Sequence, residues 1–309
     1  MTLYRRETTM TLYQRKLYTL LAQSGLLANI IPYSERIPCL SNCESNLPEW
    51  EERRRRADEI SKGSARVNFE RLYHRTSHPP NAVPVGHLIS GQHRTVGNLP
   101  QLNDEIIDRL NAVAGNDDNP AKKPFWWLWR FYPEYLAQQQ PDALLYPADR
   151  LIPDSPLHSY NSTVSAIAGA IPEDYKQEDV DKHPYLLLFT FSPVQEFIKS
   201  SRKFLDFWAG SYLLHYLSAK LCWFIAERYG PDAVITPSLW SQEIIDALMV
   251  EQYPDFSENF HRFPENSHPV TRFQNNTSTS LSTAGFPNVI TAIVPGKEAA
   301  KTLGEDLSL

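Results

Sequence analysis

The sequence has few cysteines, few glycines and no long apolar run. Its 309 residues include 3 Cys. That is too few for a disulfide framework and typical of a reducing compartment. No apolar stretch reaches the roughly 18 residues that a membrane-spanning helix needs, and the N-terminus lacks the apolar core of a signal peptide. We therefore expect a soluble, cytoplasmic protein that contacts no membrane.

A basic charge excess is also missing. The chain has 30 Lys and Arg against 36 Asp and Glu, so its net charge is −6 and no overall basic field attracts nucleic acid. The run Arg53–Arg56 is basic, but acidic residues flank it, which favours a solvated helix face. Nucleic-acid contact would then be local, or supplied by partner subunits. A hydrophobic content of 42% excludes wholesale disorder.

The first half of the chain reads as mainly helical. Met1-Thr2-Leu3-Tyr4-Arg5-Arg6 returns as Met10-Thr11-Leu12-Tyr13-Gln14-Arg15, which indicates a local duplication or a start codon at either Met1 or Met10. Apolar periodicity and charge pairs predict helices from Leu12 and over 49–66, 103–114, 125–140 and 161–171. Residues 32–48, 74–100 and 141–160 read as loops or irregular segments. The acidic stretch 173–182 is a linker, which predicts two domains, 1–183 and 184–309.

The second half mixes strands and helices. Strands are expected over 185–191, 233–235 and 289–294, and a helix over 297–307. Between the first two strands we expect one helix up to Tyr229, ended by Gly230-Pro231. Ser192 would cap it, with Pro193 in the first turn and Gln195 completing a capping box. The order β-α-β-β-α predicts an incomplete ferredoxin-like domain without its last strand, and an α+β chain. Either the polypeptide is a fragment or a partner supplies that strand.

Four side chains have the chemistry of zinc ligands: Cys39, Cys43, His74 and His78. Their pairs lie thirty residues apart, and the Cys-x3-Cys spacing is wider than a zinc knuckle, which favours incidental loop residues. No adjacent His-Asp pair, phosphate-binding P-loop or Gly-x-Ser-x-Gly elbow is present. A stand-alone, metal-dependent phosphohydrolase or nuclease with an HD-like domain, built on the histidine-rich first half, remains an alternative.

The turn at Ser192 is the candidate nucleotide contact. Free backbone N–H groups at the start of a helix attract phosphate, although every capped helix has such groups. We therefore name Ser192, Gln195 and Ser211 as nucleotide-binding candidates and predict no catalytic residue. The aromatic residues between Phe204 and Trp223 recur with the spacing of a helix. This pattern favours a packed core over a surface that stacks nucleic-acid bases.

The sequence over 192–214 resembles a family signature. It reads Ser192-Pro193-Val194-Gln195-Glu196-Phe197-Ile198, followed by Arg202-Lys203 and then by Asp206-x-Trp208-Ala209-Gly210-Ser211-Tyr212-Leu213-Leu214. The family is the large subunit of type III-B CRISPR effector complexes, the polymerase-cyclase protein of the Cmr type. The resemblance implies an N-terminal helical HD domain followed by two palm-like ferredoxin folds. It also implies that ATP becomes cyclic oligoadenylate at a Gly-Gly-Asp-Asp metal site when target RNA is bound.

This chain departs from the family pattern twice. Leu20-Leu21-Ala22-Gln23 stands where the family carries its Leu-Leu-His-Asp, and no Gly-Gly-Asp-Asp is present. The resemblance then implies a degenerate HD-like domain and a truncated first palm domain, inactive alone and without bound divalent metal. We expect a scaffold for antiviral defence that contributes an ATP half-site in the complete complex. Its partners would be the other effector subunits, through them guide and target RNA, and the missing C-terminal part of the same subunit.

Overall fold

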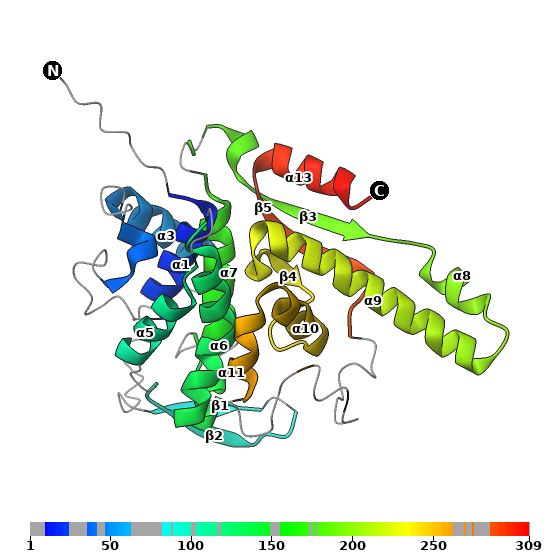
Figure 1. The fold of residues 1–309 in the computed structure, drawn as a ribbon, viewed down its shortest axis with the longest axis horizontal. Coiled ribbons are helices and arrows are strands. Elements are labelled where there is room, and N and C mark those ends of the chain that lie inside the picture. The colour runs from blue at the N-terminus through cyan, green and yellow to red at the C-terminus, as the bar shows by residue number, and fades with distance from the viewer. Residues whose placement is uncertain are drawn as a thin grey trace. The chain divides into compact units, whose positions relative to one another are not determined.

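The computed structural model describes residues 10–24, 36–41, 47–62, 82–87, 89–99, 103–115, 119–148, 155–172, 175–176, 178–261, 269, 274 and 285–308. The chain divides into two compact units, residues 1–168 and 169–309. Helices dominate both, and each described unit holds one small sheet (Figure 1), which confirms the predicted α+β class. Among the helices described, none is both long and apolar enough to cross a membrane.

Unit 1 is built around helix α6 (Lys122–Gln139). Phe125, Trp126 and Trp127 on this helix are at most 1% exposed, which confirms that the aromatic cluster forms a core. The capping box of Thr11 and Gln14 starts α1 (Leu12–Gln23), which packs on α6. The other predicted helices are also present, with bounds shifted by a few residues: α3 (Leu47–Ser61), α5 (Asn103–Val113) and α7 (Leu157–Ala170).

Unit 1 also contains a hairpin that the sequence analysis missed. Strands β1 (Ala82–Gly86) and β2 (His93–Gly97) pair antiparallel, with the buried Val83 opposite Val96. The turn is closed by the backbone N–H of His87, which donates to the carbonyl of Gln92 at 2.8 Å, and Gly91 adopts a φ of 67°. The prediction of an irregular segment over 74–100 is therefore wrong for these strands. Five-residue strands with a Pro in one of them are too short to show a clear alternation.

Unit 2 contains a three-stranded antiparallel sheet. Strands β3 (Pro184–Thr190) and β4 (Val234–Thr236) flank the central β5 (Val289–Pro295), in the order β3-β5-β4. All three predicted strands are confirmed. Helices α10 (Glu243–Gln252) and α11 (Ser257–His261) follow β4, in a region for which the sequence had given no helix signal. Helix α13 (Gly296–Asp306) follows β5 as predicted.

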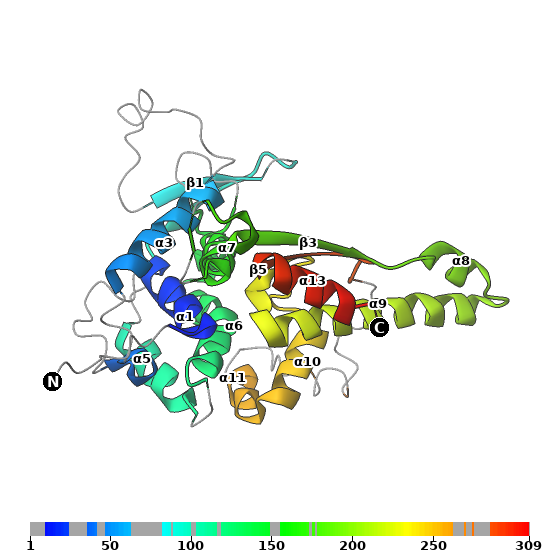
Figure 2. The same ribbon diagram turned by 90° about the horizontal axis from the view of Figure 1, so that it is seen from above.

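The two faces of this sheet differ in exposure. Ile290, Ala292 and Val294 of β5 are at most 1% exposed and form the covered face. Helices α9 (Phe204–Tyr229) and α13 lie on one side of the sheet (Figure 2). On the opposite face Leu186 and Leu188 of β3 are 67% and 66% exposed. One face of the sheet is therefore open and apolar.

The expected long helix is interrupted. Helix α8 (Val194–Lys199) ends, residues 200–203 are not helical, and α9 begins at Phe204. The side chain of Ser200 donates a hydrogen bond to the carbonyl of Phe197 at 2.7 Å. Serine competes for backbone carbonyls in this way and favours helix ends. The prediction of one continuous helix is wrong, whereas its predicted end at Tyr229, followed by Gly230 with a φ of 97°, is confirmed.

Candidate docking surface and nucleotide contacts

The turn at Ser192 connects β3 to α8. It is tied to the sheet next to it, because the side chain of Asn288 donates to the carbonyl of Phe191 at 3.0 Å. Ser192 itself is exposed, and Pro193 occupies the N-cap position of α8 with no side-chain capping bond. The predicted capping box of Ser192 and Gln195 is therefore wrong. Proline at the N-cap position moves the helix start one residue beyond the expected place and leaves the Ser192 hydroxyl outside it.

The three nucleotide-binding candidates are spread over three elements. Ser192 lies in the turn, the exposed Gln195 on α8, and the half-buried Ser211 on α9. Helix α8 folds back on α9, where a Cβ atom at Gly210 would lie 3.5 Å from Cε1 of Phe197. The small residue therefore allows the two helices to approach at the position before Ser211. None of the three candidates is fully buried, so a ligand could reach each of them.

Two exposed cations precede α9. Arg202 and Lys203 lie directly before its first residue, and Lys203 at the N-cap position makes no side-chain capping bond. A helix start with unused backbone N–H groups and nearby cations favours an anion such as phosphate. Asp206 in the first turn opposes an anion there. The sequence had predicted a capped helix start at Ser192, eleven residues before Lys203.

Unit 2 presents an exposed apolar surface. We call residues 194–217, which comprise α8 and the first half of α9, the apolar arm. The arm extends beyond the sheet, away from α10 and α13 (Figures 1 and 2). Phe204 and Leu205 are 85% and 71% exposed, and Trp208 stacks on Tyr212 with ring centroids 5.6 Å apart. The arm's other exposed large side chains are Phe197, Phe207, Leu213, Tyr216 and Leu217. The prediction that the aromatic residues over 204–223 form a core is therefore wrong for the first half of α9.

The metal-ligand candidates are only partly described. Cys43, His74 and His78 lie outside the described residues. Cys39 is buried, and burial raises the pKa of its thiol to about 11. The thiol of Cys39 is therefore protonated at physiological pH in the free chain. Within the described ranges, no three His, Cys, Asp or Glu side chains are grouped to hold a metal ion.

Comparisons with known proteins agree on one family. Residues 186–308 match the family model of "CRISPR-associated protein Cmr2, N-terminal". The CRISPR system Cmr subunit Cmr2 of Pyrococcus furiosus is 28% identical over 223 residues, covering 66% of this chain and 22% of that protein. The chain thus spans under a quarter of the length of this relative.

Two solved cryo-EM structures share the fold. A chain of the type III-B Cmr-beta complex in its apo state matches with a TM-score of 0.54 and 19% identity, over 77% of this chain and 24% of that one. A chain of type III-B Cmr-beta bound to cognate target RNA matches with a TM-score of 0.58 and 17% identity, over 95% of this chain and 31% of that one.

These findings confirm the resemblance that the run after Ser192 indicated. Taken together, the comparisons support a fragment of the Cmr2 large subunit of type III-B CRISPR effector complexes. The part that matches the Cmr2 family model, residues 186–308, corresponds to the N-terminal region of that family.

Proposed function

We propose that this chain is a docking scaffold within a type III-B effector that acts in cytoplasmic antiviral defence. The single observation that carries the proposal is the apolar arm, whose side chains are exposed at up to 85%. Large contiguous apolar surfaces are rare on free proteins and mark places where a partner binds. Aromatic residues such as Phe207 and Trp208 are also the types that are enriched at protein interfaces.

The occupants that we propose for the arm are the remaining part of the large subunit and the neighbouring effector subunits. Unit 2 also presents a free sheet edge, because β3 pairs only with β5 among the described strands. The order β3-β5-β4 is that of a ferredoxin-like fold from which the strand beside β3 is missing. This agreement supports the proposed palm-type assignment. A strand added at β3 would complete the sheet and satisfy its edge backbone groups.

We further propose an ATP half-site at the start of the arm, with Ser192, Gln195 and Ser211 as contacts. The exposed Arg202 and Lys203 support it, since they add positive charge beside the uncapped start of α9. Because this sequence contains no Gly-Gly-Asp-Asp, cyclic oligoadenylate synthesis and its metal ions would require a second palm. Unit 1 would be the degenerate HD-like domain, and guide and target RNA would be contacted through other subunits.

Docking is tested by placing a charge on the arm. Phe204→Asp and Leu205→Asp should each weaken association with the other effector subunits by about tenfold or more, because a carboxylate would be buried at the interface. Ile60→Asp on α3 is the matched control, since Ile60 is a 49% exposed apolar residue of unit 1. Co-purification and titration with the assembled subunits provide the measurement. Equal affinity for all three variants would overturn the proposal.

The nucleotide half-site needs its own measurement. Replacing Gln195 by Ala in the assembled effector should weaken ATP binding by about threefold to tenfold, the effect of one lost hydrogen bond. Gln252→Ala is the control, because Gln252 is also an exposed glutamine, on α10. Unchanged ATP affinity in Gln195→Ala would remove this residue from the site without affecting the docking proposal.

A further inference from the structure

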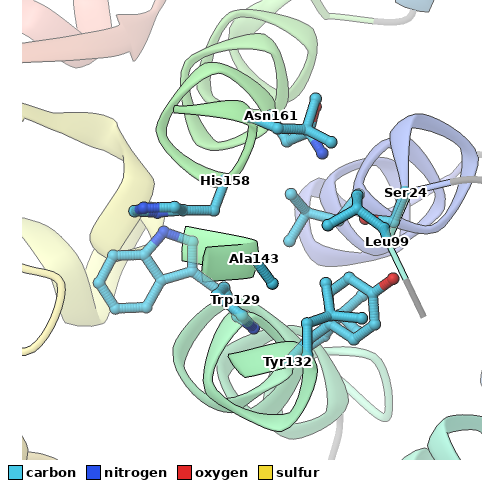
Figure 3. A pocket seen from close by; sticks show the side chains of 12 residues that line it. Ser24, Leu99, Trp129, Tyr132, Ala143, His158 and Asn161 are labelled. Carbon is cyan, nitrogen blue, oxygen red and sulfur yellow. The ribbon is translucent and has the colours of Figure 1, made fainter. Parts of the chain in front are cut away.

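Unit 1 contains a pocket that the proposed scaffold function does not use. Its empty space is about 550 Å³, including the part that opens to solvent. Helices α1, α6 and α7 form its walls, and Ala143 from the short 3-10 helix η3 (Pro141–Leu145) and Leu99 after β2 complete them (Figure 3). All of the lining residues belong to unit 1.

The wall is mainly apolar and carries no charge. Leu20, Leu128 and Leu136 supply aliphatic surface, and Trp129 and Tyr132 supply aromatic rings. Of the described residues that line the pocket, none is Lys, Arg, Asp or Glu. A charged ligand would lose its hydration here without gaining an opposite charge, which is costly. The pocket therefore favours an uncharged molecule.

The titratable groups on the wall are neutral at physiological pH. Burial lowers the pKa of His158 to about 4 and raises the pKa of Tyr132 to about 12. His158 is therefore an uncharged imidazole, and Tyr132 keeps its hydroxyl proton. In Figure 3 the imidazole of His158 lies beside the indole of Trp129. The polar groups of the wall can exchange hydrogen bonds but cannot balance a charged ligand.

Asn161 gives the pocket its polar specificity. Its side chain is only 5% exposed, and within the described part of the chain its Oδ1 atom has no hydrogen-bond partner. A buried amide oxygen without a partner costs on the order of 1–3 kcal/mol. The side chain of Asn161 extends from α7 at the wall of the pocket (Figure 3). A ligand that pairs with the amide would satisfy a group that the protein leaves unsatisfied.

We propose that this pocket binds a flat, uncharged aromatic molecule that carries a hydrogen-bond donor and acceptor side by side. The donor–acceptor edge pairs with the carboxamide of Asn161, and the ring packs on Trp129 and Tyr132. Side-chain amides recognise such edges through two parallel hydrogen bonds. Planar rings stack on aromatic side chains with little dependence on their substituents.

Benzamide is the probe for this chemistry. Saturation-transfer NMR and calorimetry with the full chain should give a dissociation constant on the order of 1 mM, as expected for a ligand of this size. Benzoate tests whether a charged ligand is excluded, and ethylbenzene, which has no hydrogen-bonding groups, tests whether the donor–acceptor edge is needed. Both should bind at least about tenfold more weakly, a difference of about 1.4 kcal/mol. Equal binding of ethylbenzene, or no binding of benzamide, would overturn the proposal.

Variants locate the bound probe. Asn161→Leu should reduce benzamide affinity about tenfold while leaving ethylbenzene binding intact. Ala143→Leu should block both by filling the pocket, whereas Ala112→Leu on the exposed face of α5 should block neither. If Ala143→Leu does not fold by circular dichroism, Leu99→Trp at the half-buried rim takes its place. Benzamide binding that persists in both Asn161→Leu and the filling variant would contradict the assignment.

Discussion

The Nδ1 atom of His215 accepts hydrogen bonds from the backbone N–H of Phe286 at 2.9 Å and from that of Gly285 at 3.0 Å. The imidazole is 3% exposed, and its ring lies 5.3 Å from the ring of Phe286. One side chain of α9 therefore fixes the segment that leads into β5. Ser218, one turn further along α9, adds a hydrogen bond to the carbonyl of Pro287 in the same segment.

Replacing His215 by Ala should destabilise the protein. The buried N–H of Phe286 and the partly buried N–H of Gly285 would lose their acceptor, and we expect a loss of about 2–3 kcal/mol in the free energy of unfolding. Urea unfolding followed by circular dichroism measures it. His261→Ala on the exposed surface of α11 is the control and should change stability by less than about 0.5 kcal/mol. A stability loss in His215→Ala no larger than in the control would show that the two bonds contribute nothing.

Stability should fall as the pH drops from about 6.5 toward 4. Burial lowers the pKa of His158 to about 4 and the pKa of His215 in the same direction, below their ordinary value of 6.5. In this window the unfolded chain binds protons that the folded chain does not, so acid favours unfolding. Each histidine contributes a slope of at most about 1.4 kcal/mol per pH unit. Above pH 6.5 both histidines are neutral in the folded and in the unfolded chain, so their full contribution to the free energy of unfolding is present.

Urea unfolding of the parent chain and of His158→Phe, at pH 7.5, 6 and 5, tests the origin of this slope. The variant should show a shallower loss of stability between pH 6.5 and 5, where the acidic groups with lowered pKa, Glu51 and Asp58, do not yet titrate. The same slope in both proteins would exclude His158 as a source.

Two glycines of α13 should respond in opposite directions to alanine. Gly296 has a φ of 85°, and a Cβ atom there would lie 3.0 Å from the carbonyl oxygen of Asp181. Gly296→Ala should therefore cost about 1–3 kcal/mol of stability. Gly304 lies inside the helix with nothing within 4 Å of its missing Cβ, so Gly304→Ala should add about 0.5–1 kcal/mol. Thermal unfolding of the two variants measures whether each raises or lowers stability. A Gly296→Ala variant as stable as the parent chain would contradict the strain at that position.

The sequence predicts the regular elements well because their signals are local. β5 follows from its run of β-branched residues, and the end of α9 follows from Gly230-Pro231. The break at Ser200 was missed, since the apolar period continues across it and only the side-chain bond to Phe197 reveals the helix end. The exposure of Phe204 was not predicted, because the helical spacing of apolar residues is the same for a face that packs in the core and for a face that is exposed to solvent.

Tertiary contacts limit what can be predicted about the sites. His215 reads as a polar residue in an apolar helix, and its partners lie 70 and 71 positions away. His158 and Asn161 are three residues apart on one helix face, but the pocket they line also needs α1, α6 and η3. The nucleotide candidates were chosen from the helix start expected at Ser192, and the actual start of α9 lies at Phe204.

The two faces of the unit 2 sheet should differ in their response to truncation. Ile290 on the covered face is 1% exposed, so Ile290→Ala should cost about 2–5 kcal/mol of stability. Leu188 on the open face is 66% exposed, so Leu188→Ala should cost less than about 0.5 kcal/mol in the free chain.

In the assembled effector the effect of Leu188→Ala should increase. If a partner covers the open face, truncating Leu188 removes apolar surface that binding would bury, and the affinity should fall about threefold to tenfold. Denaturant unfolding of the free chain and titration with the other subunits separate the two effects. Unchanged affinity of Leu188→Ala for the other subunits would show that no partner covers this face in the complex.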